Sequence, residues 1–326
     1  MAEQFRGIPL WRCEGHMKKE ILFSGIILLA AAGIVQAQQE PDLEYKPPLP
    51  KPAYESGKGP RVAIDEAHHN YHTATGRYKP FAEFLRRDGY RVAGLGQPLS
   101  SDSLNGVDVL VIANALNERN VEDWSLPTPS AFTTDEIAAV RAWVEKGGAL
   151  FLIVDHMPFP GAAGDLARAF GVEFSNGFAV SKPAGMPATF TFGQGAGLRE
   201  SAITLGCGGQ ENVTEVKTFV GSAFKVPQDA TPVLVFSVNY LSLKPAKAWQ
   251  FAAATPKESL EGWCQGAVMK VGNGRVAVFG EAAMFSAQLA GPGKQKVGMN
   301  APEAKQNHQL LANVLHWLTR APGMPD

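Results

Sequence analysis

The sequence predicts a doubly wound α/β domain with a mostly parallel sheet. Short apolar segments alternate with amphipathic helical segments, which is the pattern of strand–helix–strand crossovers. One apolar segment, residues 149–154 (ALFLIV), is an almost unbroken hydrophobic run, typical of a central strand covered on both faces. Between about residues 171 and 271 the pattern becomes irregular, with short strand-like pieces, and indicates a β-rich insertion or an extension of the sheet.

The spacing of apolar residues, together with capping and helix-ending residues, predicts the helices and strands in order. A helix is predicted over residues 78–87, because its apolar residues are spaced three and four apart. A second helix begins at a capping box, in which Thr133 and Glu136 satisfy each other's free backbone donors, and ends before Gly147. A closing helix is predicted over residues 303–318. Strands are predicted at residues 61–65, 90–93, 107–113, 149–154 and 275–280, and within the insertion at TFTFG, TPVLVFSV and AWQFAAAT.

The N-terminal part of the chain differs from the predicted domain. From Met17 it reads MKKEILFSGIILLAAAGIVQAQQE, with lysines before an apolar run and small residues leading to Ala37. This pattern predicts a signal peptide cleaved after Ala37 and a true start at Met17, with residues 1–37 comprising extension and signal peptide. We therefore expect a periplasmic or secreted protein without a stable membrane span after cleavage. Residues 38–60 are proline-rich and predict a semi-rigid linker before a folded domain at 61–326.

The amino-acid composition limits the classes of binding partner that the chain is expected to have. With 45% hydrophobic and 19% charged residues the chain is typical of a globular protein, and its net charge of -1 argues against nucleic-acid binding. Outside the N-terminal extension the cysteines are Cys207 and Cys264. Export would permit them to form a disulfide, and the alternative is a pair of buried thiols.

Acidic residues and histidines follow the ends of three predicted strands. In open parallel sheets, ligands bind beyond the carboxyl ends of the strands, so these side chains are expected to share one crevice. A partly dry crevice raises carboxyl pKa values towards working pH. The general acid and base candidates are Asp65, Glu66, Asp155 and Glu281. The ligand-binding candidates are His68, His69, Asn70, His72, His156 and Trp124.

The same residues suggest a metal centre as one alternative. Neutral imidazoles and carboxylates together suit Zn, Fe or Mn, and the candidate ligands are His68, His72, Asp155 and His156. The alternative without a metal is a hydrogen-bonded polar network, and the absence of an HExxH motif from the chain favours it. No G-x-S-x-G elbow follows the strands named above, which argues against a serine hydrolase.

Two further regions carry candidate side chains. The long connection over residues 114–132 leaves the same sheet edge, and loops of this length are often lids or binding loops. Its Trp124 is expected either to stack on a sugar or to pin the loop. In the closing helix, His308 falls on the apolar face and is expected in the core, whereas His316 shares a face with Gln309 and is expected to be solvated.

The chain also resembles a known group of proteins. IDEAHHNYHTATGRYKPFAEFLRRDGYRV, LVIANAL, FTTDEIAAVRAWVEKGGALFLIVDH, GRVAVFGEAAMFSAQ and NHQLLANVLHWL resemble an uncharacterised bacterial domain family in the glutamine amidotransferase-like superfamily, related to trehalose-utilisation-type domains. The resemblance implies a class I glutamine amidotransferase-like, flavodoxin-like sheet. Classical members carry a nucleophilic cysteine after a central strand, where this chain has Asp155, His156 and Met157, so glutaminase activity is not expected.

Three hypotheses about function follow. The first is an exported domain that binds a small polar ligand, such as a carbohydrate or another cell-envelope component, at the carboxyl edge of its sheet. The second is a hydrolase, metal-dependent or acid/base, that uses the same residues. The third is a catalytically inactive scaffold for protein contacts.

Overall fold

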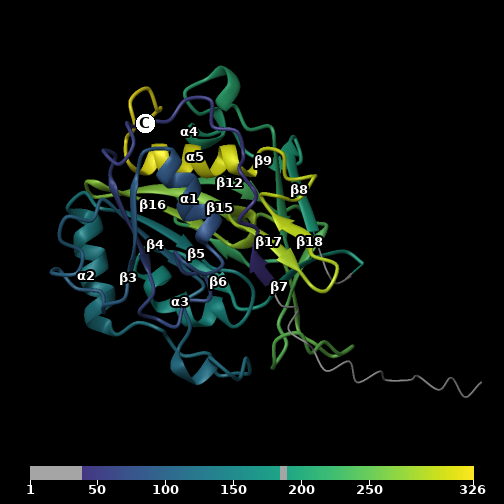
Figure 1. The fold of residues 1–326 in the computed structure, drawn as a ribbon. Helices are drawn as coiled ribbons and strands as arrows, with labels where there is room; N and C mark the ends of the chain where they lie inside the picture. The colour runs from purple at the N-terminus through teal and green to yellow at the C-terminus, as the bar shows by residue number, and fades with distance from the viewer. Residues whose placement is uncertain (1–38, 184–188) are drawn as a thin grey trace, which may run out of the picture. The chain divides into compact units, whose positions relative to one another are not determined.

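The computed structural model describes residues 39–183 and 189–326. Within these residues a 12-stranded central sheet is accompanied by two three-stranded sheets (Figure 1). The predicted signal peptide, its cleavage site and the start at Met17 lie outside the described residues. Of the helices in the described part of the chain, none combines the length and apolar character needed to cross a membrane.

Five parallel strands form the core of the central sheet. They lie in the order β3, β2, β4, β5, β16, which is the 2-1-3-4-5 arrangement of flavodoxin-like folds. The predicted doubly wound α/β class is therefore confirmed. Each of the five strands lies close to its predicted position: β2 (Arg61–Asp65), β3 (Arg91–Leu95), β4 (Val109–Ala113), β5 (Ala149–Ile153) and β16 (Gly274–Phe279).

Helices cover both faces of this parallel core. α1 and α5 pack on one face, and α2 and α3 on the other (Figure 1). The buried strand β4 alternates accordingly, since Val111 faces the first helix pair and Ile112 the second. The described helices are α1 (Lys79–Arg87), α2 (Thr134–Glu145), α3 (Phe159–Arg168), α4 (Ala202–Leu205) and α5 (Asn307–Leu318), with short 3-10 turns η1 (Glu118–Asn120), η2 (Gly209–Glu211) and η3 (Ala283–Phe285).

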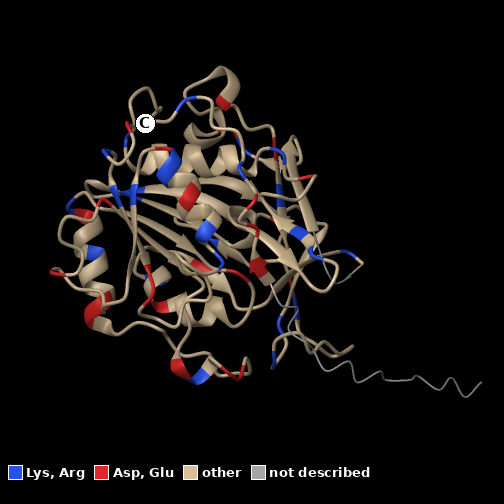
Figure 2. Cartoon of the chain, in the orientation of Figure 1, with Lys and Arg blue, Asp and Glu red and all other residues tan. Residues whose placement is uncertain are grey.

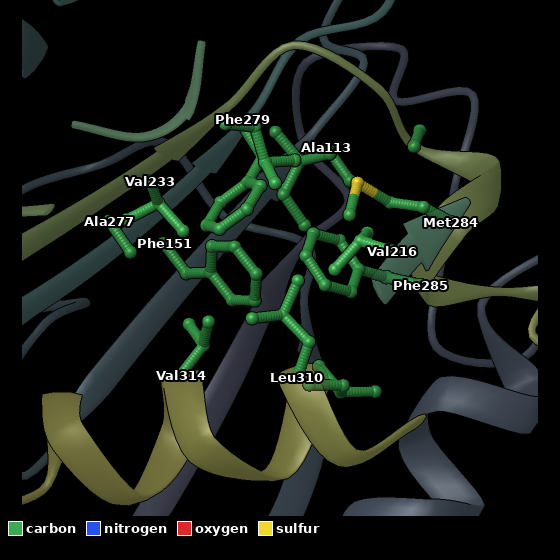
Figure 3. Packing of buried hydrophobic residues seen from close by; sticks show 14 of the residues in the cluster. Ala113, Phe151, Val216, Val233, Ala277, Phe279, Met284, Phe285, Leu310 and Val314 are labelled. Carbon is green, nitrogen blue, oxygen red and sulfur yellow. The ribbon is translucent and has the colours of Figure 1, made fainter. Parts of the chain in front are cut away.

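Aromatic side chains fill the core under α5. Phe151 of β5 lies 5.2 Å from Phe285 and 5.9 Å from Phe279, ring centre to ring centre, in edge-to-face contacts (Figure 3). Leu310 and Val314 of α5 point towards these rings. Fully burying a side chain of this size contributes about 1.5–3 kcal/mol, so this cluster fixes the parallel strands against the helix layer.

The predicted β-rich insertion is present. Its strands extend the sheet beyond β16 through antiparallel pairing and form a separate three-stranded sheet, β14-β13-β7. AWQFAAAT forms no strand, however, because its first residues turn away after a bridge between Lys247 and Ser125. The strands of this region are β6 (Glu173–Ser175), β7 (Phe178–Ser181), β8 (Thr189–Gln194), β9 (Gly197–Leu198), β10 (Glu215–Phe219), β11 (Ala223–Lys225), β12 (Thr231–Val235), β13 (Tyr240–Leu243), β14 (Lys257–Ser259) and β15 (Cys264–Val271).

Residues 39–60, which we call the N-terminal strap, pack along the domain and do not form the predicted linker. β1 (Gln39–Pro41) pairs with β17 (Ala287–Ala290), which pairs with β18 (Gln295–Gly298). Beyond β1, the Asp42 carboxylate accepts a hydrogen bond from Asn300 at 2.9 Å. The prolines favour an extended path, as expected, but that path lies against the folded surface.

Of the two alternatives for the cysteines, the disulfide does not form, and a buried thiol is found only at Cys264. Cys207 is exposed, Cys264 is buried, and both are free thiols. Cys264 begins β15 and packs among apolar residues, where burial raises the pKa of its thiol to about 11. The Cys207 thiol lies instead near the Pro322 carbonyl.

The capping box at the start of α2 is confirmed. The Thr133 hydroxyl accepts the Glu136 backbone N–H, and the Glu136 carboxylate accepts the Thr133 backbone N–H at 2.9 Å. We expect Thr133→Ala to lower the free energy of unfolding by about 1 kcal/mol, because it removes the cap acceptor. Urea unfolding measures this effect. Thr133→Ser is the control, because serine keeps a hydroxyl that can cap the helix. Equal losses in the two variants would contradict a capping role.

Candidate functional site

The carboxyl ends of four parallel strands meet at one edge of the sheet. The loop after β2 crosses the end of β4, where the Tyr71 N–H donates to the Asn114 carbonyl at 2.9 Å. The Asn114 side chain in turn accepts the Asp155 N–H, after β5, at 2.8 Å. Tyr78 donates its hydroxyl to the Ala282 carbonyl, after β16, at 3.0 Å. The strand ends are thus joined by direct hydrogen bonds.

A buried imidazole lies between two carboxylates at this edge. His68 Nδ1 lies 2.9 Å from each oxygen of Asp65, and its Nε2 lies 2.9 Å from Oε1 of Glu136, the capping residue of α2. Asn70 donates to Asp65 at 2.9 Å and accepts the His68 N–H. We call His68, Asp65 and Glu136 the imidazole lock, because they tie the end of β2 to the start of α2.

The electrostatics of the imidazole lock favour a charged histidine. Burial by itself lowers the pKa of His68, but hydrogen bonds to Asp65 and Glu136 outweigh it and raise the pKa above its ordinary value. For Glu136, burial opposes ionisation, yet hydrogen bonds from Thr133 and His68 lower its pKa to about 2. An imidazolium can donate from both ring nitrogens, which matches a carboxylate on each side.

A second polar cluster lies after β2, β4, β5 and β16. His72 Nδ1 lies 3.2 Å from the Asn114 amide nitrogen, and its Nε2 is buried without a hydrogen-bond partner in the described structure. The Glu281 carboxylate is fully buried and accepts the N–H groups of Ala283 and Met284 at 2.6 and 2.8 Å. Asp155 is half-buried and accepts the N–H of His156 at 2.8 Å.

Burial shifts the protonation of this second cluster. It lowers the pKa of His72 to about 3, with help from the charge on Arg77, so the ring is neutral. Burial raises the pKa of Asp155, and burial together with the Asp155 charge raises the pKa of Glu281 well above its ordinary range. The two carboxyls therefore resist simultaneous ionisation, and they titrate as a pair.

Aromatic rings surround His156 beside Asp155. The imidazole stacks on Phe178 with ring centres 4.4 Å apart, and Trp249 meets it edge-on at 4.7 Å. Trp124 lies 6.1 Å from His156 and 5.7 Å from Tyr71. Half-buried Trp124 also accepts the Ala248 N–H on its carbonyl, so packing pins this loop to the insertion. Three separate loops and the start of β7 deliver these rings.

The structure does not assemble every predicted site residue into one group. Asp65 and His68 lie in the imidazole lock, whereas His72, Asp155 and Glu281 lie in the second cluster. Glu66 accepts the Ala74 N–H at 2.8 Å within its own loop, and His69 is exposed. Among the described residues no three His, Cys, Asp or Glu side chains are placed to hold a metal ion, so the predicted ligand set His68, His72, Asp155 and His156 is not formed.

The sequence did not predict several residues that lie at this edge of the sheet. Asn114 follows β4 directly, so the rule that found Asp155 also points to it. Glu136 was recognised as a cap, but no pattern indicates its contact with His68, 68 positions earlier. Trp249 has a left-handed backbone, with φ 66°, which a tryptophan rarely adopts and no local motif signals.

Comparison with known proteins supports the fold. No family model and no curated protein matches the chain. Among solved structures, the mmIFT52 N-terminal domain is similar with a TM-score of 0.54 and 15% identity over 80% of this chain and 98% of that one. A ThuA-like protein from Bacteroides uniformis reaches 0.44 with 12% identity, covering 81% and 94% of the two chains. At these identities the similarity concerns the fold alone.

Proposed function

We propose that the chain binds a small polar ligand, foremost a carbohydrate, at the carboxyl edge of its parallel sheet. The observation that carries the proposal is the ring of aromatic side chains around His156 beside the half-buried Asp155 carboxylate. Sugars present apolar C–H faces and hydroxyl groups together. Aromatic rings pack against the C–H faces, and a carboxylate accepts hydrogen bonds from the hydroxyl groups. Such mixed surfaces are typical of ligand sites.

The buried polar atoms nearby support this proposal. His72 Nε2 has no hydrogen-bond partner in the described structure, and leaving such an atom unsatisfied costs about 1–3 kcal/mol. Asn114 connects His72 to the backbone of Asp155, so the three residues form a continuous polar path to the half-buried carboxylate. A hydroxyl or water held near His72 would satisfy the neutral ring.

A second candidate function is acid/base hydrolysis at the same edge. The observation favouring it is the Asp155 and Glu281 pair, in which burial raises the pKa of both carboxyls above their ordinary values. Asp155 is the half-buried member and would meet the substrate, while the fully buried Glu281 would tune it. A metal-assisted form of this reaction does not fit, because no three His, Cys, Asp or Glu side chains among the described residues are placed to hold a metal ion.

The proposal also covers the superfamily and the cellular location of the chain. We place the chain in the glutamine amidotransferase-like superfamily without glutaminase activity, on the flavodoxin-like strand order and on Asp155-His156-Met157 after β5. We also propose export to the periplasm or beyond, on the signal-like sequence ending at Ala37. Fractionation of cells that express the full chain, with sequencing of the mature N-terminus, tests the export proposal.

A binding screen tests the ligand proposal. Glycans and polar metabolites are titrated against the parent, Trp124→Leu and Asp155→Asn by calorimetry. We expect at least one glycan to bind the parent, and both variants to weaken it by about tenfold, equivalent to 1.4 kcal/mol. Release of a product by the parent, lost in Asp155→Asn, would favour hydrolysis over binding alone.

Trp143→Leu is the matched control, because this half-buried tryptophan lies on α2, away from the aromatic ring around His156. It should bind like the parent. If no glycan or metabolite binds, or if Trp143→Leu weakens binding as much as Trp124→Leu, the carbohydrate proposal fails and the scaffold hypothesis takes its place.

A further inference from the structure

A hollow of about 430 Å³ lies at the opposite end of the parallel strands from the candidate site. Arg61 and Arg91, the first residues of β2 and β3, lie side by side in the sheet and line it. Arg86, in the last turn of α1, lines it from the helix layer, and Ser56 and Gly57 of the N-terminal strap close one side. Three arginines therefore contribute to the lining of one space.

These three arginines have no acidic partner in the described part of the chain. Arg86 donates to the Val92 carbonyl at 3.0 Å and Arg91 to the Gly59 carbonyl at 2.9 Å. Asp108 is the carboxylate beside Arg61, and it accepts the backbone N–H of Arg61 at 2.7 Å without pairing with its guanidinium. In the view of Figure 2, basic and acidic residues are interspersed over the described chain.

All three arginines are solvent-exposed, so water and salt screen their mutual repulsion, and an anion in the hollow would relieve it further. Like charges in one hollow repel each other, and the surface arginines Arg141 and Arg168 show the usual solution, because each pairs with a carboxylate on its own helix. Each guanidinium offers five N–H donors, and one carbonyl occupies only part of them. The carbonyl bonds of Arg86 and Arg91 also hold the side chains in place, which reduces the entropy lost on binding.

We propose that this hollow binds a phosphate-bearing small molecule. A phosphate group matches the fork of donors on arginine, and its two negative charges suit a site with three cations better than a single carboxylate does. The hollow is larger than a bare phosphate ion requires, and it is also lined by Tyr90, Val92 and Ala93. These residues provide a partly apolar wall for the organic part of the ligand. The site is independent of the carbohydrate proposal, since it lies at the other sheet edge.

Calorimetric titration of the full chain with inorganic pyrophosphate and with glucose 1-phosphate tests the proposal. We expect the parent to bind at low ionic strength with an affinity that falls as salt is added. The double variant Arg61→Gln, Arg91→Gln should bind at least tenfold more weakly. The charge-preserving pair Arg61→Lys, Arg91→Lys should fall between the two, because lysine lacks the fork.

Arg87→Gln is the matched control. It removes the same charge from the same turn of α1, but its guanidinium donates to the Pro47 carbonyl and does not line the hollow. It should bind like the parent. Absence of binding to the parent, or equal losses in Arg87→Gln and the double variant, would overturn the proposal. Binding only to vesicles of phosphatidylglycerol, and to neither soluble phosphate, would overturn it as well.

Discussion

Replacing His68 with alanine is expected to lower the free energy of unfolding by about 3–5 kcal/mol, the cost of breaking a buried ion pair from one side. The imidazole is 7% exposed, Asp65 is fully buried, and Glu136 is 8% exposed. Without the imidazole, two carboxylates remain in a desolvated space with no cation between them. The end of β2 and the start of α2 also lose their direct connection. Urea unfolding followed by circular dichroism measures the loss.

His69→Ala is the control for this measurement, because the neighbouring histidine is exposed. Surface changes of this kind usually alter stability by no more than about 0.5 kcal/mol. If His68→Ala unfolded within that margin of the parent, the imidazole lock would contribute no net stability. Glu136→Gln offers a second check, since it keeps the shape of the side chain but removes one of the two charges.

The stabilisation from the imidazole lock depends on pH in opposite directions at its two ends. The pKa of His68 is raised in the folded state, so its contribution is full below about pH 6.5 and is lost as pH rises through the folded value. The pKa of Glu136 is lowered from 4.5 to about 2, so its contribution is present above pH 4.5 and is lost as pH falls towards 2. The stability difference between parent and His68→Ala should therefore be largest between these limits.

The sequence predicted the parallel core well because its signals are local. An unbroken apolar run such as ALFLIV needs no partner to be recognised as a buried strand, and the Thr133 capping box spans only four positions. The rule that ligands gather beyond strand ends likewise placed Asp155 and Glu281 at one edge. The rule does not predict where each side chain points, so it did not separate the imidazole lock from the second cluster.

The features that escaped prediction depend on distant packing. The AWQFAAAT segment has strand-like composition, yet the bridge from Lys247 to Ser125 and the turn at Trp249 bring the Trp249 ring to His156. The proline-rich composition of the N-terminal strap correctly favours an extended path, but composition carries no information about the surface that receives it. His316 shows the same limit. It shares a helix face with Gln309, as the pattern indicated, but it is buried because a carboxylate covers that position.

That carboxylate belongs to Asp88, and we expect Asp88→Ala to lower the free energy of unfolding by about 3–5 kcal/mol. The side chain is fully buried at the end of α1. One oxygen lies 2.7 Å from His316 Nε2 on α5, and the other accepts the Ala53 N–H of the N-terminal strap at 2.7 Å. Alanine would leave both groups without a partner, so α5 and the N-terminal strap would lose a shared attachment.

Hydrogen exchange separates the two consequences of this change. Global stability is read from urea unfolding, while amides of residues 43–58 should exchange faster in Asp88→Ala even where the rest of the domain stays protected. Asp165→Ala is the control, because its carboxylate is exposed and pairs only with Arg168, an interaction worth about 0–1 kcal/mol. Unchanged exchange over residues 43–58 would mean that β1 and the contact between Asp42 and Asn300 hold the N-terminal strap without Asp88.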